Sequence, residues 1–422
     1  MRSDGSLPPT VPMGPVDVAY RLAARDGALP LPFVFAFDGP APSLDSVRAR
    51  VAERAPRIPA LNYRPDPDAT VFRRTGALAV ERHVREIDVP GTVDADATGR
   101  LFLSRPMDVE DGPLWDVWLV RGTAGGHVLC YRTDHTVQDG MGAVYAARAL
   151  LDDRPGEQPA APRRAAPALS GITGVLGDLA AGFGAPTPKP GFDGPVGGRT
   201  GVRHVTVPLA RLRAAGRTHG GTVNDVYLAA LAHAVRTWHL EATGTVHPPL
   251  PVVVPMSVRA PGEEHAPGNR MVTARLLLPC DAPSSTEAVR RVTAATRRLR
   301  DSRRRDSFRV LLAGTARSVG GRLGLRLVNG AVVAGPASSV NFGAPLLHQG
   351  AVSRWSAVYS GLASGIRSLM TLTSQRDTAC LTVVHDGNLA TAAELPDRWL
   401  AALAELERTG PAVSAERRVS RS

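Results

Sequence analysis

The feature that most constrains the fold is a break in composition near the middle of the chain. Residues 152–200 are rich in proline, glycine and alanine, with a helical pattern only over 172–183. Such composition is typical of a linker, because proline and glycine interrupt regular structure. With 422 residues, the chain also exceeds the size at which one hydrophobic core usually stops growing. We therefore expect two lobes, 1–155 and 201–422, joined by a linker over 156–200.

Hydrophobic periodicity predicts helices and strands mixed along both lobes, which favours an α/β or α+β class. Strand patterns occur at 31–38, 251–255, 271–278, 338–342, 369–374 and 378–384. Helical patterns occur at 44–57, 142–151, 226–240 and 396–405. No internal repeat is visible.

A predicted hairpin in the first lobe leads to the segment that concerns function most. Residues 115–120 alternate as a half-buried strand, turn through glycines, and return as a second strand over 127–131. This hairpin delivers the chain to the segment 134–140, with the sequence Asp-His-Thr-Val-Gln-Asp-Gly. The loop can therefore direct His135 into a cleft.

The residues of this loop have complementary chemical uses. His135 has an unperturbed pKa of about 6.5, so the neutral ring can accept a proton from an attacking hydroxyl, which typically contributes ~10²- to 10⁴-fold in rate. Gly140 allows a sharp turn into the next helix, and Asp139 can pair with a cation to fix the loop. Taken alone, a histidine followed four residues later by Asp-Gly is a weak pattern, and a lone loop histidine is more often structural than catalytic.

The wider sequence gives the loop its context. The segment resembles the HHxxxDG motif of the thioester-dependent acyltransferases, which include chloramphenicol acetyltransferase, peptide-synthetase condensation domains and the bacterial wax ester synthase/diacylglycerol acyltransferases. Landmarks that resemble the last of these families follow one another along the chain: Met13-Gly14-Pro15-Val16-Asp17, Pro113-Leu114-Trp115, Thr222-Val223-Asn224-Asp225, Pro255-Met256-Ser257-Val258-Arg259 and Gly268-Asn269. The resemblance extends from about residue 12 to residue 408.

The resemblance implies both a fold and a reaction. Two chloramphenicol-acetyltransferase-like lobes, each a mixed sheet flanked by helices, would enclose a channel with His135 near its middle. An acyl-CoA or acyl carrier protein thioester would enter from one side as cosubstrate, and a small-molecule hydroxyl or amine acceptor from the other. Transfer would be direct, without an acyl-enzyme and without a permanently bound cofactor.

The resemblance also implies roles for single residues. Asp139 would be structural, with Arg259 as its cationic partner, although Arg259 could equally be a surface arginine. Residues 338–343 look like the counterpart of the family's Ser-Asn-Val-Pro-Gly-Pro segment, so Ser339 and Asn341 are candidates for the channel lining, with strand-end capping as the alternative.

Further motif residues are expected to line the channel or to support the structure. Ser257 and Asp134 belong to the first group. Asn224 and Asp225 are expected to cap and brace a helix. The remaining structural motif residues are Pro113, Trp115 and Asn269.

The main departure from the motif is Asp134, which stands where the family usually has its first histidine. A carboxylate facing His135 would raise the pKa of that histidine, although adjacent strand residues normally point in opposite directions. Together with the short length and the altered Ser-Asn-Val segment, this departure suggests a specialised branch that acts on a natural-product intermediate rather than on storage lipid.

Charge composition does not favour a nucleic-acid partner. The formal net charge is +11, but Lys189 is the only lysine, and the excess of arginine, alanine, glycine and proline is typical of a GC-rich genome. The densest arginine cluster lies at 297–305 without interleaved aromatic residues, so we interpret it as a solvated helix face or loop. A basic rim that attracts the phosphates of a cofactor is compatible with it.

Cysteine spacing and hydropathy indicate what to expect of metal binding, disulfide bonds and cellular location. Cys130, Cys280 and Cys380 lie far apart and form no CxxC pair, so neither a metal site nor a disulfide framework is expected. Residues 1–14 lack the apolar core of a signal peptide, and no apolar run reaches the roughly 18 residues of a membrane span. We expect a cytoplasmic protein without a transmembrane segment, and the sequence predicts no oligomeric state.

Two alternatives remain open beside acyl transfer. The altered motif could mark a member that binds a carrier protein or ligand, or that catalyses a different reaction, without acyl transfer. The apolar and basic stretch 308–333 could support a peripheral membrane role, or could form an amphipathic helix packed on its own lobe.

Overall fold

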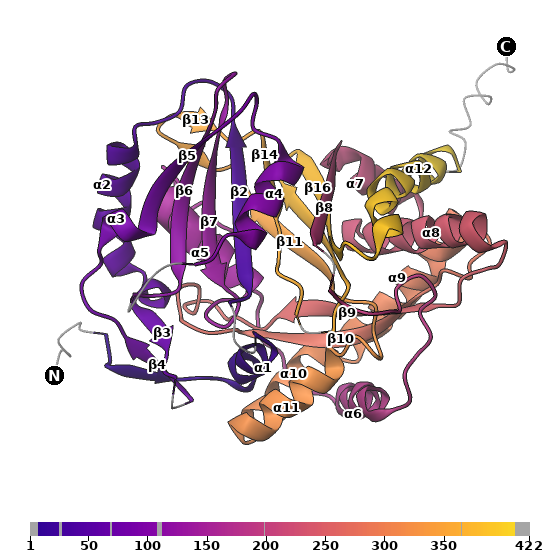
Figure 1. The fold of residues 1–422 in the computed structure, drawn as a ribbon. Coiled ribbons are helices and arrows are strands. Elements are labelled where there is room, and N and C mark those ends of the chain that lie inside the picture. Colours follow the sequence, from indigo (N-terminus) through magenta and orange to yellow (C-terminus); the bar gives the residue numbers. More distant parts are fainter. Residues whose placement is uncertain are drawn as a thin grey trace, which may run out of the picture.

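The computed structural model describes residues 7–24, 28–67, 70–107, 112–197, 199–363 and 365–409. Parts of the predicted terminal and linker segments, namely 1–6, 198 and 410–422, lie outside these ranges. Figure 1 shows two β-sheets side by side, with helices on their outer faces and a further group of helices along one edge.

The first sheet has five strands in the order β14-β2-β7-β6-β5. Its strands are β2 (Pro30–Phe37), β5 (Val84–Val89), β6 (Trp115–Gly122), β7 (His127–Asp134) and β14 (Trp355–Val358). Only β5 and β6 run parallel, so the sheet is mixed, and β6 with β7 forms the predicted hairpin. Helices α2 (Leu44–Arg54) and α5 (Gly140–Leu151) cover the face that carries Phe33 and Phe35.

The second sheet has four strands in the order β11-β15-β16-β8. They are β8 (Thr200–Pro208), β11 (Ala337–Gly343), β15 (Ser368–Gln375) and β16 (Thr378–Asp386), with β11 and β15 parallel. The helices beside it are α7 (Leu209–Thr218), α8 (Val223–Thr243), α9 (Ser285–Asp301) and α12 (Leu395–Arg408). A long antiparallel pair, β9 (Leu250–Ser257) and β10 (Met271–Leu278), lies next to β11 through a bridge between Val253 and Pro336.

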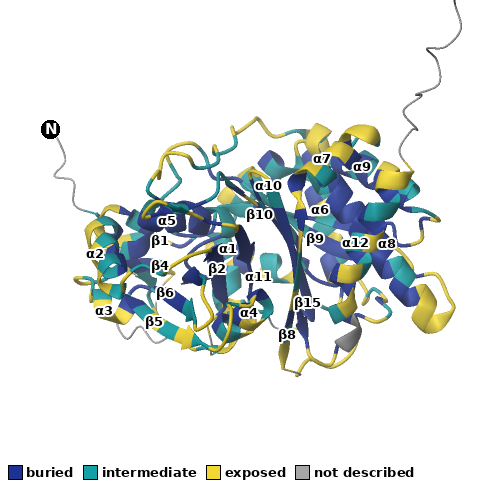
Figure 2. Cartoon of the chain, turned by 90° about the horizontal axis from the view of Figure 1, so that it is seen from above, coloured by how far each residue is buried: buried dark blue, intermediate teal, exposed yellow. Residues whose placement is uncertain are grey.

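The two sheets share a buried contact. Val34 of β2, Phe102 of α4 (Ala95–Ser104) and Val384 of β16 belong to one apolar cluster. Figure 2 shows the sheets as buried layers, with exposed residues on the outer helices. The mixed sheets flanked by helices confirm the predicted fold class.

Four helices pack along the β9–β10 pair (Figure 1): α1 (Pro15–Ala24), α6 (Leu169–Phe183), α10 (Arg304–Ala313) and α11 (Arg317–Leu327). Helices α1 and α11 approach closely because α11 carries glycines at the crossing: a Cβ at Gly320 or Gly321 would lie 2.7 Å from Pro15 or Val18. The stretch 308–333 therefore packs, at α11, against the protein's own α1. Helix α6 of the predicted linker packs on α10 and α11.

The remaining described elements are short. They are β1 (Thr10–Pro12), β3 (Tyr63–Pro65), β4 (Val71–Arg74), α3 (Val80–His83), β12 (Leu347–His348), β13 (Ala351–Val352) and the 3₁₀ turns Ala55–Arg57, Pro59–Asn62 and Ala390–Glu394. Strand β1 pairs with β4, and β4 with β3.

One connection was not foreseen from the sequence. Strand β14 comes from the C-terminal half of the chain, yet it pairs antiparallel with β2 of the first sheet. The C-terminal half therefore supplies an edge strand to the N-terminal sheet, a feature that the predicted lobe boundaries do not describe. Those boundaries stay a prediction.

Candidate active site

The turn that follows β7 holds His135 at the end of the first sheet. The backbone N–H of His135 donates to Leu29 O at 2.9 Å, and Val137 N donates to Asp134 O at 2.9 Å. From the other half of the chain, Gly268 N donates to Val137 O at 2.9 Å. The turn is therefore fixed by backbone bonds from both sides.

Asp134 is buried and its carboxylate faces the backbone. One oxygen accepts from Leu29 N at 2.8 Å and the other from Thr136 N at 2.7 Å. Burial raises the pKa of Asp134 above its ordinary value, against the opposing effect of these hydrogen bonds. The prediction that Asp134 lines the channel is therefore corrected: both its oxygens are used to hold the turn.

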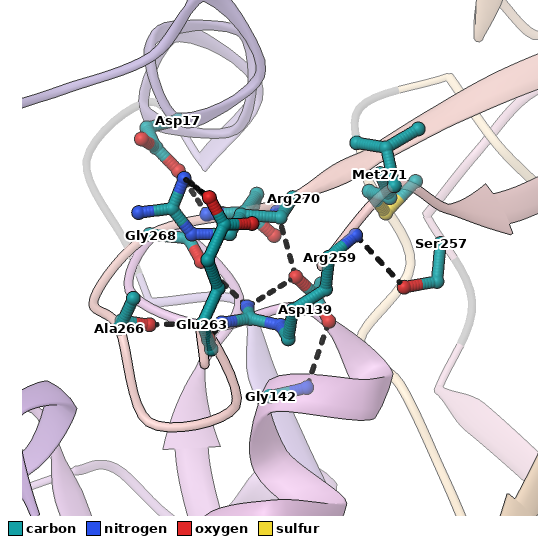
Figure 3. A network of polar contacts seen from close by, with 12 residues as sticks. Asp17, Asp139, Gly142, Ser257, Arg259, Glu263, Ala266, Gly268, Arg270 and Met271 are labelled. Carbon is teal, nitrogen blue, oxygen red and sulfur yellow. Dashed lines mark hydrogen bonds and ion pairs between the residues drawn. The ribbon is translucent and has the colours of Figure 1, made fainter. Parts of the chain in front are cut away.

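Asp139 forms the buried ion pair that was expected with Arg259 (Figure 3). Arg259 Nη2 lies 2.6 Å from Asp139 Oδ2, and both side chains are nearly inaccessible to solvent. Asp139 also accepts from Arg270 N at 2.7 Å and, as the N-cap of α5, from Gly142 N at 2.8 Å. Burial raises the pKa of Asp139, but Arg259 and these hydrogen bonds outweigh it, so the pKa lies below its ordinary value.

Arg259 also binds the loop that follows β9. Its guanidinium donates to the carbonyls of Glu263, Ala266 and Gly268 at 2.7, 3.0 and 3.0 Å. A Cβ at Gly142 would lie 2.7 Å from Arg259 Nη2, so this glycine leaves the space for the guanidinium. Arg259 is fully buried, which excludes the surface alternative, and it does not belong to the wall of the cavity beside His135, so it is not a channel-lining residue there.

Gly140 does not serve the expected sharp turn. Its φ is not positive, and an added Cβ would meet only Val340 at 3.7 Å. The helix start instead depends on the Asp139 cap, and the residue that requires glycine is Gly142. Gly140 lies at the wall of the cavity described below.

Asn269 and Asp17 fix the carbonyl side of the turn. Asn269 Nδ2 donates to His135 O at 2.8 Å and to Asp17 Oδ1 at 2.9 Å. Asp17 also accepts from Asn269 N and Gly14 N, at 2.6 and 2.7 Å. Burial raises the pKa of Asp17 to about 6, although its hydrogen bonds act in the opposite direction.

The imidazole of His135 stacks on Tyr20 of α1. The ring centroids are 3.8 Å apart and the planes differ by 16°. Burial lowers the pKa of His135, while Asp139 and Asp134 raise it by smaller amounts. The ring is therefore neutral at neutral pH. Its buried Nδ1 has no hydrogen-bond partner among the described residues.

A cavity of about 130 Å³ opens beside the ring. His135, Asp139, Gly140, Ser257 and Ser339 line it, together with further hydroxyl side chains from Tyr20, Thr273, Ser338, Ser360 and Thr371. Strands β9, β10, β11 and β15 of the C-terminal half supply much of the wall. His135 thus lies between residues of the two halves.

The segment 338–343 contributes serines to this cavity, but Asn341 does not line it. Asn341 is exposed and its Oδ1 accepts from Gly343 N at 2.9 Å, so the strand-end alternative describes it correctly. Successive residues of a strand point to opposite faces, and β11 turns Ser339 rather than its neighbour Val340 toward solvent.

The residues at the start of α8 have different roles. Thr222 caps α8 in a reciprocal capping box with Asp225, and Asp225 also accepts from Thr296 of α9 at 2.6 Å. Asp225 therefore caps and braces the second half, as expected. Asn224 instead lines a cavity whose wall also carries Arg300 and Arg303.

Pro113 and Trp115 support the turn from beneath. Leu114 O accepts from Asp134 N at 3.0 Å, and the Trp115 indole donates to Leu61 O at 3.0 Å. Both Pro113 and Trp115 are buried. Their position agrees with a structural role.

Sequence reasoning missed Tyr20, Gly142 and the hydroxyls of Ser360 and Thr371. Tyr20 had a weak signal, because it lies three residues after Asp17 and so on the same face of α1. Gly142, Ser360 and Thr371 had none, because their contacts with Arg259 or with the cavity arise only through the tertiary fold.

Other site classes find no support within the described ranges. No group of three or more His, Cys, Asp or Glu side chains could hold a metal ion there. Cys130, Cys280 and Cys380 are free and buried. Of the helices in the described segments, none is long and apolar enough to cross a membrane.

Comparison with protein families gives one match in the region of the histidine turn. The model of the wax ester synthase/diacylglycerol acyltransferase catalytic domain matches residues 31–171. A Mycobacterium tuberculosis protein named as a diacylglycerol O-acyltransferase is 31% identical over 276 residues, covering 54% of this chain and 58% of that protein. A second such protein is 26% identical over 268 residues, covering 52% and 54%. The matches thus span little more than half the length of these relatives.

Solved structures resemble nearly the whole chain. The wax ester synthase/diacylglycerol acyltransferase of Marinobacter aquaeolei has a TM-score of 0.63 at 21% identity, covering 94% of this chain and 99% of that one. The first condensation domain of the calcium-dependent antibiotic synthetase has a TM-score of 0.65 at 18% identity, covering 95% and 96%. The starter condensation domain of rhizomide synthetase, in complex with C8-CoA, has a TM-score of 0.60 at 13% identity, covering 94% and 95%.

The fold is therefore that of the condensation-domain and wax ester synthase class, with two lobes. Within this class, the family match and the relatives support the wax ester synthase/diacylglycerol acyltransferase family. Both findings agree with the resemblance that the sequence motifs indicated.

Proposed function

We propose that the protein transfers an acyl group from a thioester to the hydroxyl, or amine, of a small acceptor, with His135 as general base. The observation that carries this proposal is a half-buried, neutral imidazole held at a cavity between the two halves of the chain. The names of the relatives and of the similar structures agree with acyl transfer. The complex of one such structure with C8-CoA agrees with a thioester donor.

In this mechanism His135 accepts the proton of the acceptor hydroxyl as its oxygen attacks the thioester carbonyl. A C–O bond forms, the carbonyl oxygen becomes an oxyanion, and the C–S bond then breaks. The proton passes from His135 to the departing thiolate, so the enzyme returns to its starting state. General base catalysis requires the free base at working pH, and the lowered pKa of His135 provides it.

The oxyanion needs hydrogen-bond donors, and loss of one such donor commonly raises the barrier by about 3 kcal/mol. Ser338 and Ser339 are the candidates, because both residues belong to the cavity wall. Asp139, Arg259 and Asn269 act through the turn and do not contact the reacting atoms. They are positioning residues in this scheme.

A second, apolar cavity indicates an aliphatic substrate. It measures about 270 Å³ and lies between α1, α10, α11 and β10. It shares wall residues with the His135 cavity, among them Tyr20, Met271 and Ala363. An alkyl chain attached to the reacting carbonyl or to the acceptor would gain about 0.8 kcal/mol for each methylene buried there. We place the reaction in natural-product or lipid biosynthesis, in the cytoplasm.

Replacement of His135 by Ala tests the proposal. Thiol release from an acyl-CoA series of increasing chain length is measured with and without an alcohol, and ester formation is followed by mass spectrometry. The expected result is a loss of about 10²- to 10⁴-fold in turnover. His219, which binds Leu406 O far along the chain from the site, provides the control His219→Ala.

Unchanged turnover in a folded His135→Ala protein would remove the base assignment. Thioester binding without ester or amide formation, across a wide acceptor panel, would favour the alternative of a member that binds without acyl transfer.

A further inference from the structure

A cavity lined by arginines adjoins the His135 cavity. It measures about 530 Å³ and is bounded by β9, the end of α9 and the start of α10. Pro255 and Ser339 belong to the walls of both cavities. The arginine-lined cavity is therefore a direct neighbour of the space beside the candidate base.

Its charged wall is strongly positive. Arg300, Arg303, Arg304 and Arg305 line it, and Asp306 is the only acidic side chain in that lining. Arg304 pairs with Asp178 at 2.7 Å, and Arg305 with Asp306 at 2.9 Å. These two arginines thus have structural partners.

Arg300 and Arg303 are different. Arg300 is exposed and has no ion pair or side-chain hydrogen bond within the described part of the chain. Arg303 is also exposed and makes one long bond, at 3.5 Å, to Ala166 O. Its φ of 51° lies in the left-handed region, which is uncommon for a residue with a side chain and is enriched at functional sites. Two guanidinium groups therefore remain available in a cavity beside the active site.

The positive surface continues outward. A groove of about 660 Å³ shares Leu299 and Arg304 with the arginine-lined cavity and carries Arg298. The basic groove, the arginine-lined cavity, the His135 cavity and the apolar cavity are thus neighbours in this order, because each shares wall residues with the next. A molecule with phosphates at one end, a thioester in the middle and an alkyl chain at the other matches this order.

We propose that Arg300 and Arg303 bind the phosphate groups of a coenzyme A thioester that enters from the α9–α10 side. This inference rests on the proposed acyl transfer and names its donor. Coenzyme A carries a pyrophosphate and a 3′-phosphate, whereas a carrier protein's pantetheine arm carries a single phosphodiester. Two guanidiniums without a carboxylate partner in one cavity suit the former, because arginine binds phosphate through paired, charge-assisted hydrogen bonds.

Binding of free coenzyme A to the full chain tests this site without requiring turnover. Calorimetry compares coenzyme A, 3′-dephospho-coenzyme A and pantetheine with the wild type and with Arg300→Glu and Arg303→Glu. We expect each variant to bind coenzyme A about 10-fold more weakly, since a charged hydrogen bond contributes on the order of one tenfold step or more. Pantetheine binding should stay unchanged. Because both side chains are exposed, the variants should fold.

Arg297 provides the matched control. It is an exposed arginine on the same helix, α9, and lies outside the linings of both basic cavities. Arg297→Glu makes the same change in net charge and should alter coenzyme A affinity less than 2-fold. An equal loss in Arg297→Glu would show a general charge effect and overturn the proposal.

Three further outcomes also overturn it: coenzyme A that binds no better than pantetheine, a phosphopantetheinylated carrier protein that binds when coenzyme A does not, or a DNA duplex that competes as well as coenzyme A. A kinetic comparison separates this site from the proposed reaction. Arg300→Glu should raise KM for an acyl-CoA and leave KM for an N-acetylcysteamine thioester unchanged. If no thioester is turned over but coenzyme A binding still depends on Arg300 and Arg303, acyl transfer fails and the binding site stands.

Discussion

The ion pair between Asp139 and Arg259 gives the sharpest test of how the histidine turn is held. Replacement of Arg259 by Met removes the cation and keeps much of the side-chain volume. Asp139 is then left as a buried carboxylate without its partner at 2.6 Å, and the carbonyls of Glu263, Ala266 and Gly268 lose their donor. Breaking a buried pair in this way commonly destabilises by about 3–5 kcal/mol.

The size of the effect follows from burial. Both side chains are almost fully shielded, so water cannot replace the lost partner. For lobes of this size, each kcal/mol lowers Tm by about 2–4 °C, so the expected fall is on the order of 10 °C. Arg164→Met is the matched control: its pair with Glu263 at 2.6 Å is partly exposed, and such pairs are worth about 0–1 kcal/mol.

A double-mutant cycle measures the pair itself. Asp139→Asn, Arg259→Met and the double variant are unfolded by urea, and the coupling free energy is expected to exceed about 1 kcal/mol because each single variant leaves a buried partner without compensation. Since the pKa of Asp139 lies below its ordinary value, the stabilisation is present at pH values above 3.8 and is lost as pH falls through the lowered pKa. If each single variant lost less than about 1 kcal/mol in its free energy of unfolding and the two losses added up in the double variant, this account would be refuted.

The remaining predictions concern the ring, the apolar pocket and the carboxylate behind the turn. Tyr20→Phe keeps the stack on His135 and should leave kcat nearly unchanged. Tyr20→Ala removes the stack and should lower kcat about 10-fold with little change in KM. Equal kcat values in the two variants would contradict the stacking role. The logarithm of kcat/KM should be flat at neutral pH and fall only below pH 6.5, because burial lowers the pKa of His135; a midpoint above 6.5 would count against it. Ala363→Leu narrows the junction of the His135 cavity and the apolar cavity. If roughly four methylenes are excluded, activity with long-chain donors should fall by about 200-fold while acetyl transfer persists. If activity with long-chain donors is unaffected but long-chain alcohols fail, the apolar cavity holds the acceptor. Asp17→Asn should remove the loss of stability that the wild type shows as pH rises from 3.8 to about 6, and an unchanged pH dependence of urea unfolding would contradict a raised pKa.

The sequence predicted most elements because their patterns are local. The hairpin β6–β7 and the strand β2 follow from alternation and apolar runs, and Thr222 follows from capping chemistry. Strand β14 could not be assigned to its sheet, because pairing with β2 joins residues more than three hundred positions apart. Long-range pairing of this kind leaves no periodic signal.

In the candidate site too, local features could be predicted from the sequence and long-range contacts could not. The partner of Asp139 could be inferred from motif order, but Gly142 could not, because its need for a small side chain arises only when Arg259 packs against α5. Tyr20 contacts His135 because α1, far away in the sequence, packs across the end of the first sheet. Asn341 was misplaced for a different reason: it shares a strand face with Ser339 but lies near the end of β11, where its amide oxygen accepts from Gly343 N.

Asp134 connects these observations to the divergence of the motif. Its two carboxylate oxygens accept from Leu29 N and Thr136 N, so the side chain ties the start of β2 to the turn after β7. An imidazole at this position has at most one acceptor nitrogen, whereas a carboxylate satisfies both amides. The carboxylate therefore holds the turn without adding a proton-transfer group to the cavity. This geometry explains how the first motif position can change while the second, His135, keeps its ring at the cavity.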